Sequence, residues 1–131
     1  MVKILIKKLS SKVKLPSYKT DGSSGMDLMA FIDKPISIMP QTSKLIPTGL
    51  FIAIPEDTEV QIRPRSGLAA KNNISVLNSP GTIDSDYRGE LKVILYNHGN
   101  NEFFVKNEDR IAQMVLVPVI KATFEEVNDL P

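Results

Sequence analysis

The densest group of reactive side chains lies in the ten residues Gly81–Glu90, whose sequence is GTIDSDYRGE. The stretch holds Asp84 and Asp86 beside Tyr87 and Arg88, with a glycine at or near each end. A turn needs one Asp or Asn and a Gly, so this stretch carries more charge than turning requires. A carboxylate such as Asp84 can accept a proton from water, which is the chemistry of a general base. Taken alone, the stretch also fits a decorated surface turn.

A second stretch, Pro64-Arg65-Ser66-Gly67, offers groups that bind anions. Arg65 precedes an expected short helix over 66–73, and we expect Ser66 to cap that helix. Free N–H groups at a helix start and a guanidinium both attract phosphate, and Gly67 lets the backbone approach a ligand. An ordinary serine cap beside an exposed arginine is the simpler alternative.

Two further charged positions lie in segments that otherwise read as strands. Asp27 interrupts the apolar run 26–31. Aspartate is depleted in strands, so Asp27 either faces solvent, which the residues alone favour slightly, or has a partner. Asp109 and Arg110 precede Gln113 at the start of another apolar run. An exposed ion pair between these neighbours is the simpler interpretation.

Short strands must position these groups. The runs 74–77 and 91–95 flank the acidic stretch, so we expect a two-strand hairpin with Gly81–Glu90 at its tip. Further strands are expected at 2–9, 26–31, 36–39, 45–55, 59–63, 102–105, 110–119 and 121–127. In 59–63, polar and apolar residues alternate, which is typical of a half-buried strand. Many strands, nine prolines and one brief helix indicate a β-sandwich, jelly roll or barrel.

The bulk composition excludes several classes of function. The 131 residues fit one domain, and the absence of cysteine excludes thiolate nucleophiles and sulfur-bound zinc. The single histidine, His98, lies in a predicted turn, so histidine metal sites and Ser-His-Asp triads lack their parts. A net charge of +1 gives no general basic surface for nucleic acid. No apolar run is long enough for a secretory signal or a membrane span, so we expect a soluble cytoplasmic protein.

Four of these stretches, in order along nearly the whole chain, resemble the motifs of the trimeric all-β dUTPases, the deoxyuridine triphosphate nucleotidohydrolases. Residues 24–30 (SGMDLMA) resemble the first motif and residues 64–69 (PRSGLA) the second. Asn78 with residues 81–90 resembles the third, and residues 109–114 (DRIAQM) the fourth. The second and third matches are specific. The other two are looser, because Ser24 stands where alanine is common and Glu108 where glycine is common.

The resemblance implies one dUTPase-like domain over residues 1–131, with a jelly-roll or β-sandwich-like fold. It implies a homotrimer whose three active sites form at subunit contacts. The implied reaction is Mg²⁺-assisted attack of water on the α-phosphorus of dUTP, giving dUMP and pyrophosphate. This reaction limits uracil in DNA and supplies dUMP for thymidylate synthesis. The implied partner is the small molecule dUTP, without nucleic acid or membrane.

The resemblance also implies how the nucleoside is recognised. Asp84 would orient and activate the attacking water and contact the sugar 3′-hydroxyl. Tyr87 would pack under the deoxyribose and block a 2′-hydroxyl. The hairpin near Asn78, Gly81 and Ile83 would read the uracil edge. Fixed main-chain donors and acceptors are left unpaired by a wrong base, which allows discrimination of roughly 10⁴-fold.

Other motif positions are implied to hold the triphosphate. Arg65, Ser66, Gly67 and Gln113 would bind the phosphates, and Asp27 would hold waters around the magnesium ion. Phosphoryl chemistry depends mostly on such positioning and charge neutralisation, because an aspartate is a weak base.

The family usually ends with a fifth motif, a glycine-rich arm with an arginine and a phenylalanine that closes over a neighbour's nucleotide. This sequence ends FEEVNDLP without that motif, and we expect the natural chain to continue past Pro131. Without the arm, we expect nucleotide binding to survive in part and turnover to fall severely, because closure supplies charge and excludes water.

Two alternative functions share the fold. A dCTP deaminase-like enzyme is one, although the acidic tip and Gly67 fit the dUTPase pattern better. A nucleotide-binding regulatory module without turnover is the other, and the missing arm is its only support. A purely structural jelly roll explains none of the four stretches jointly.

Overall fold

Alternating burial marks several strands of this chain. In β5 (Thr58–Arg63), Val60 and Ile62 are buried between more exposed neighbours, as the pattern predicts. In β8 (Glu90–Asn97), every second residue from Leu91 onward is buried. Such alternation turns one face of each strand towards the core. The computed structural model describes residues 1–131.

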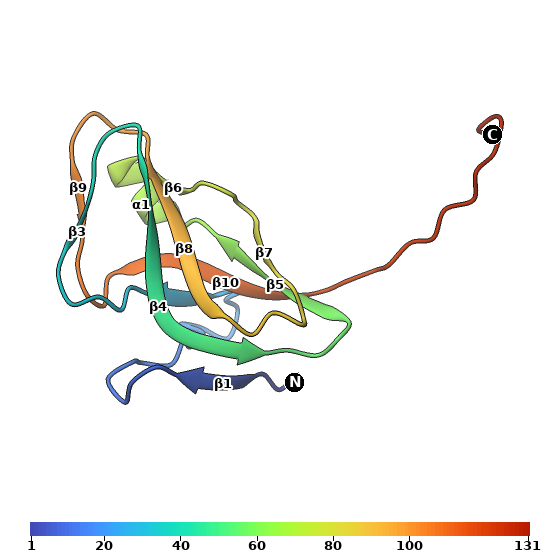
Figure 1. Cartoon of the computed structure of the whole chain (residues 1–131), viewed down its shortest axis with the longest axis horizontal. Helices are drawn as coiled ribbons and strands as arrows, with labels where there is room; N and C mark the ends of the chain where they lie inside the picture. The colour runs from blue at the N-terminus through green and yellow to red at the C-terminus, as the bar shows by residue number, and fades with distance from the viewer.

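Ten strands and one helix follow one another along the chain. They are β1 (Leu5–Lys8), β2 (Met26–Met29), β3 (Ile36–Ile38), β4 (Ser43–Ala53), β5, α1 (Ser66–Asn72), β6 (Ile74–Val76), β7 (Gly81–Ile83), β8, β9 (Phe103–Val105) and β10 (Arg110–Pro118). Figure 1 shows the long strands β4 and β8 side by side, with the helix at the opposite end of the molecule from β1. The helix has seven residues, and no helix is long and apolar enough to cross a membrane.

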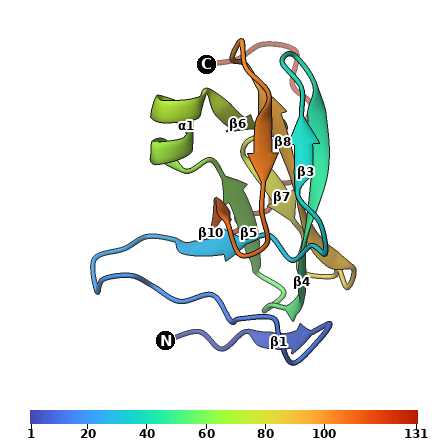
Figure 2. The same cartoon turned by 90° about the vertical axis from the view of Figure 1, so that its left-hand side faces the viewer.

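Two four-stranded antiparallel sheets enclose the core. One sheet has the order β1-β4-β8-β6, the other β2-β10-β5-β7, and β3 pairs with β9 in a separate ribbon. Figure 2 shows β4 and β8 on one side and β2, β10 and β5 on the other. Leu28 and Met114 from one sheet and Ile46 and Leu91 from the other belong to one cluster of 19 buried residues. The all-β, sandwich-like class with one short helix is therefore confirmed.

The predicted hairpin is correct in its pairing and wrong at its tip. Strands β6 and β8 pair antiparallel, with Val76 opposite Leu95. However, Gly81–Ile83 do not turn; they form β7, which pairs with β5 in the other sheet, Gly81 opposite Ile62. Gly81 is buried and Ile83 packs on the core, so apolar contact draws this segment across the molecule. The acidic turn begins only after Ile83.

The strand expected at 121–127 does not form. No residue beyond β10 belongs to a strand, and nearly all of them are exposed. Figure 1 shows this segment leading away from the sheets as an extended tail. Ile120 and Phe124 are 95% and 99% exposed, because no strand of the same chain lies beside them.

Candidate active site

Strand β10 brings three of the motifs together. It pairs with β2 on one side and with β5 on the other, so Gln113 lies opposite both Asp27 and Arg63. Strand β5 then continues through Pro64 into Arg65, directly before helix α1 begins at Ser66. The residues of the first, second and fourth motifs therefore meet at one place in the sheet.

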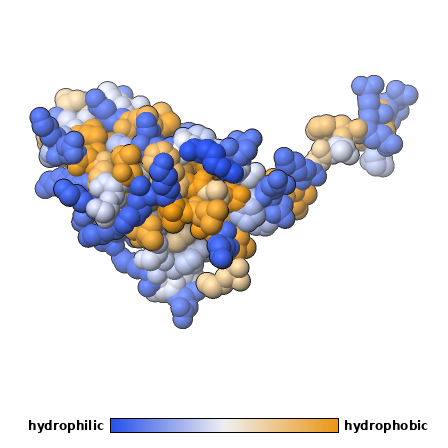
Figure 3. Space-filling view, turned by 60° about the horizontal axis from the view of Figure 1, so that its bottom comes forward, coloured by the Kyte–Doolittle hydropathy of each residue, from blue (hydrophilic) through white to orange (hydrophobic).

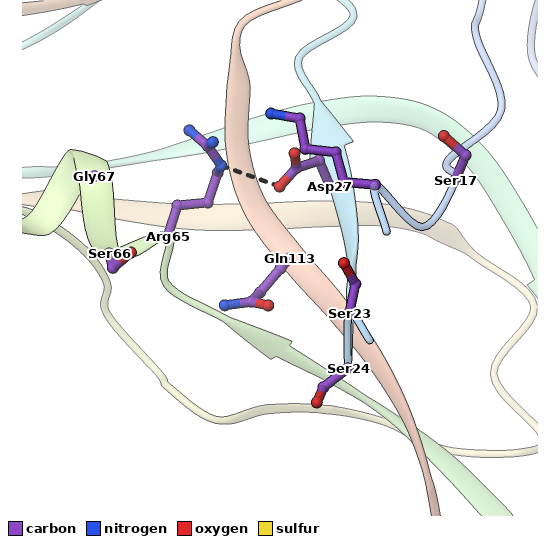
Figure 4. Close-up of a pocket in the computed structure, with 10 residues that line it drawn as sticks. Ser17, Ser23, Ser24, Asp27, Arg65, Ser66, Gly67 and Gln113 are labelled. Carbon is purple, nitrogen blue, oxygen red and sulfur yellow. Dashed lines mark hydrogen bonds and ion pairs between the residues drawn. The ribbon is translucent and has the colours of Figure 1, made fainter. Parts of the chain in front are cut away.

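A polar pocket of about 280 Å³ lies where these motifs meet. Its ten lining residues include no hydrophobic one, and they are Ser17, Lys19, Ser23, Ser24, Gly25, Asp27, Arg65, Ser66, Gly67 and Gln113. All five residues expected to hold phosphate or magnesium are in this set. Figure 4 shows Asp27, Arg65, Ser66 and Gln113 around the same space, with Ser23 and Ser24 beside them. We call this hollow the phosphate pocket.

Asp27 has two arginine partners. Its Oδ1 lies 3.0 Å from Arg65 Nε, the contact dashed in Figure 4, and its Oδ2 lies 3.8 Å from Arg110 Nη1. The side chains of Arg65 and Asp27 are only 24% and 27% exposed. The solvent-facing interpretation of Asp27 is therefore wrong. The expected pair between neighbours is wrong too, because the Asp109 carboxylate instead accepts from the Lys106 N–H at 2.8 Å.

Gly25 and Gln113 fit closely against each other. A Cβ atom on Gly25 would lie 2.8 Å from Gln113 Oε1 and 3.0 Å from the carbonyl oxygen of Met114. Only glycine lets this loop approach β10 so closely. The Gln113 amide donates to the Pro64 carbonyl at 3.0 Å, which ties β10 to the start of the second motif.

The helix start differs from the expectation in one respect. Arg65, with extended backbone at φ −90° and ψ 129°, is the N-cap residue, and no side chain makes a capping hydrogen bond. The predicted Ser66 cap is wrong, because Ser66 is already the first helical residue. Its exposed hydroxyl lines the phosphate pocket instead. A Cβ atom on Gly67 would meet nothing within 4 Å, so open space lies beside its backbone.

Asp84 lies in a different hollow. This second hollow, which we call the acidic hollow, has a volume of about 790 Å³. It is lined by Glu56, Asp57, Thr58, Glu59, Asp84, Ser85, Asp86, Val119 and Lys121. No residue lines both hollows. The expected catalytic carboxylate and the expected phosphate ligands are therefore in separate places on one chain.

Tyr87 follows the acidic turn and is fixed by two contacts. Its backbone N–H donates to the Asp84 carbonyl at 3.1 Å, and its hydroxyl donates to the Glu90 carbonyl at 2.9 Å. The ring folds back over Gly89, where a Cβ atom would lie 2.5 Å from Tyr87 Oη. The residue remains 42% exposed, so a ligand can still reach the ring.

The residues expected to read a base are also near one another. A Cβ atom on Gly81 would lie 3.1 Å from Asn78 Nδ2, so the Asn78 amide lies directly against the start of β7. Ile83, at the other end of β7, is partly buried against the core. This segment joins Asn78 to Asp84 through one short strand.

Sequence reasoning missed several polar residues of the phosphate pocket. Ser17, Lys19 and Ser23 precede the first motif. Arg110, which does not line the pocket, reaches Asp27 from the fourth motif. The glycine- and serine-rich loop after Lys19 was the available signal. His98 remains outside both hollows, with Nε2 at 2.7 Å from Ser75 Oγ.

The donor set of the phosphate pocket fits magnesium only in a limited way. The chain has no group of three or more His, Asp or Glu side chains arranged to hold a metal ion. Asp27 is the one carboxylate of the pocket. Magnesium is commonly held by one or two carboxylates together with waters and substrate phosphates, so the pocket fits an ion that arrives on a triphosphate.

The fold and the two hollows define a small all-β protein with one polar pocket and a separate acidic hollow. The chain belongs to the dUTPase family, whose model matches residues 11–131.

Close relatives in sequence carry one name. A deoxyuridine 5′-triphosphate nucleotidohydrolase of Chlamydia pneumoniae is 57% identical over 116 residues, which cover 88% of this chain and 80% of the relative. The protein of the same name from Cytophaga hutchinsonii is 56% identical over 116 residues, covering 88% and 75%.

Solved structures share the fold at lower identity. A mutant dUTPase from phage phi11 of S. aureus superposes with a TM-score of 0.87 at 19% identity, covering 98% of both chains. The dUTPase of Staphylococcus bacteriophage 80alpha gives a TM-score of 0.87 at 21% identity, again covering 98% of both. These likenesses confirm the fold.

Proposed function

We propose that this protein hydrolyses dUTP to dUMP and pyrophosphate. The family match supports this activity, and relatives at 56% and 57% identity are named as deoxyuridine 5′-triphosphate nucleotidohydrolases. One observation of the structure carries the proposal. The phosphate pocket gathers Arg65, Ser66, Gly67 and Gln113 without any apolar side chain, as a triphosphate site requires.

Asp84 is the base in this proposal. It accepts a proton from a water molecule whose oxygen attacks the α-phosphorus, while the bond from that phosphorus to the β-phosphate bridging oxygen breaks. Pyrophosphate leaves with the bonding electrons. The acidic hollow is open, so a bound nucleotide must exclude bulk water from Asp84.

Tyr87 and the start of β7 select the nucleoside. The Tyr87 ring is held by its hydrogen bond to Glu90 and packs under the deoxyribose, where it leaves no room for a 2′-hydroxyl. The backbone near Asn78 and Gly81 reads the uracil edge, with Ile83 beside it. Backbone groups held in a strand cannot rearrange to suit another base, and this rigidity supplies the selectivity.

The phosphate pocket holds the triphosphate. Arg65, Ser66 and Gln113 donate to phosphate oxygens, and the open space beside Gly67 admits them. Asp27 would hold, through waters, a magnesium ion that enters with the nucleotide. When bound, that ion neutralises phosphate charge as it develops.

Two observations support a homotrimer with shared sites. The phosphate pocket and the acidic hollow have no residue in common, as expected if each complete site takes one hollow from each of two chains. The isolated chain also exposes many large apolar side chains, including Leu5, Leu45 and Phe104. Figure 3 shows orange apolar patches among blue hydrophilic residues on one face of the chain. Such surface is typical of contacts between subunits.

The test uses the purified chain, alone and extended by the glycine-rich arm that the family resemblance implies. Each form is incubated with Mg²⁺ and dUTP, dCTP, dTTP or UTP, and released pyrophosphate and ammonia are measured. We expect pyrophosphate from dUTP alone, and Asp84→Asn to lower the rate about 100-fold or more.

Other outcomes identify the alternatives. Ammonia from dCTP would replace the proposed function with deamination. Tight binding of dUTP without product by both forms would indicate a regulatory module.

A further inference from the structure

Lys19 lines the phosphate pocket but belongs to none of the motifs. It is exposed and directly precedes the loop Thr20–Gly25. Only three of the ten lining side chains carry charge, namely Lys19, Asp27 and Arg65. The balance among these three charges decides how strongly the pocket attracts an anion.

Two of the three charges already neutralise each other. Asp27 and Arg65 form an ion pair at 3.0 Å, and Arg110 approaches the same carboxylate at 3.8 Å. Lys19 takes part in none of the three ion pairs of the chain, and its amine makes no side-chain hydrogen bond. Lys19 is therefore the one lining cation without a counter-charge in this chain.

The backbone next to Lys19 is held in place by a tight turn. The N–H of Thr20 donates to Ser23 Oγ at 3.1 Å, and the two hydroxyls lie 2.9 Å apart. The Ser23 N–H donates back to the Thr20 carbonyl at 3.1 Å. At its far end, the loop is packed against Gln113 through Gly25. The loop thus anchors the Lys19 backbone at the rim of the pocket, while its long side chain stays adaptable.

We propose that Lys19 binds the β- and γ-phosphates of the nucleotide. The inference rests on the proposed function, because it concerns the same substrate. The α-phosphorus must lie near the water held by Asp84, and hence beside the acidic hollow. Lys19 lines the phosphate pocket and not the acidic hollow, so it faces the phosphates distant from Asp84. An ammonium on a flexible stem is a point charge that follows phosphate oxygens well.

The test compares two ligands that differ in the distal phosphates. Binding of dUMP and of the analogue dUpNHpp is measured by calorimetry, with Mg²⁺, for the unmodified protein, Lys19→Ala and Lys19→Arg. We expect Lys19→Ala to weaken dUpNHpp binding roughly tenfold, since a charge-assisted contact at an exposed site is worth about one order of magnitude. We expect unchanged binding of dUMP and substantial rescue by Lys19→Arg. Steady-state rates should show the same loss in KM with a smaller change in kcat.

Lys34→Ala is the matched control. Lys34 is also exposed, carries the same charge and lines none of the hollows described. If Lys34→Ala and Lys19→Ala lost equal affinity for dUpNHpp, the effect would come from the total positive charge of the protein. That result would overturn the inference. Equal weakening of dUMP and dUpNHpp would overturn it as well, because it would show a structural role.

The inference and the proposed function fail in different ways. If the unmodified protein releases pyrophosphate from dUTP while Lys19→Ala binds dUpNHpp normally, only the role of Lys19 is wrong. If the unmodified protein neither hydrolyses dUTP nor binds dUpNHpp, the proposed function is wrong, and the role of Lys19 falls with it.

Discussion

Two inactive variants should restore activity to each other when they assemble together. Asp84 lines the acidic hollow and Arg65 the phosphate pocket, and the two hollows have no residue in common. Suppose that each active site takes Asp84 from one subunit and Arg65 from the next. An Asp84→Asn chain then still supplies an intact phosphate pocket, and an Arg65→Ala chain still supplies an intact acidic hollow.

The fraction of activity that is restored follows from the cyclic symmetry of the proposed trimer. A mixed trimer holds two copies of one variant and one copy of the other. In either case, only one of its three sites is intact, because it takes Asp84 from an Arg65→Ala chain and Arg65 from an Asp84→Asn chain. A mixed trimer should therefore show about one third of the unmodified activity. Each variant alone should keep at most roughly a few per cent, since it lacks the base or a charge-assisted phosphate contact.

The two chains are co-expressed with different affinity tags and purified over both tags, so that only mixed assemblies remain. Light scattering gives the number of chains, and pyrophosphate release from dUTP gives the rate. Separately purified variants, mixed without exchange, serve as the control. Mixed trimers with no more activity than the two separate variants would refute the shared site, because both halves would then belong to one chain.

Two further substitutions test contacts within the chain. Gly25→Ala would place a Cβ atom 2.8 Å from Gln113 Oε1 and 3.0 Å from a β10 carbonyl. We therefore expect the free energy of unfolding to fall by about 1–3 kcal/mol and dUpNHpp binding to weaken. Urea unfolding checks this, with Gly22→Ala as the control, since a Cβ atom there meets nothing within 4 Å; equal stability of the two variants contradicts the prediction. Tyr87→Phe keeps the ring but removes the 2.9 Å hydrogen bond to Glu90, so we expect a loss of about 0.5–1.5 kcal/mol with little change in the preference for dUTP over UTP. A large gain in UTP hydrolysis by this variant would show that the hydroxyl itself, and not the ring, excludes the ribose.

Local sequence patterns predicted most of the strands, because burial of one face imposes alternation on each strand separately. The 59–63 segment is an example, and it became β5 with Val60 and Ile62 buried. No alternation in the sequence indicated that Gly81–Ile83 crosses into the other sheet. Three residues are too few for a period, and their partner, β5, lies about twenty positions earlier in the chain.

The members of the phosphate pocket could be predicted only where a motif contained them. Gln113 meets Asp27 through the pairing of β10 with β2, a contact between segments far apart in the sequence. The partners of Asp27 depend on that pairing, which is why a solvent-facing carboxylate was a reasonable and incorrect expectation. Lys19 has no periodic or motif signal, and only the folded loop brings it to the pocket.

The ion pair between Asp27 and Arg65 means that the phosphate pocket contains its own counterion. A small free anion that competes with Asp27 for Arg65 Nε leaves that half-buried carboxylate with only Arg110, at 3.8 Å, which is costly. A ligand that carries both phosphates and a divalent cation instead offers a new partner to each member of the pair. On the proposed function, this ion pair would therefore favour polyphosphates that arrive complexed with metal over small free anions.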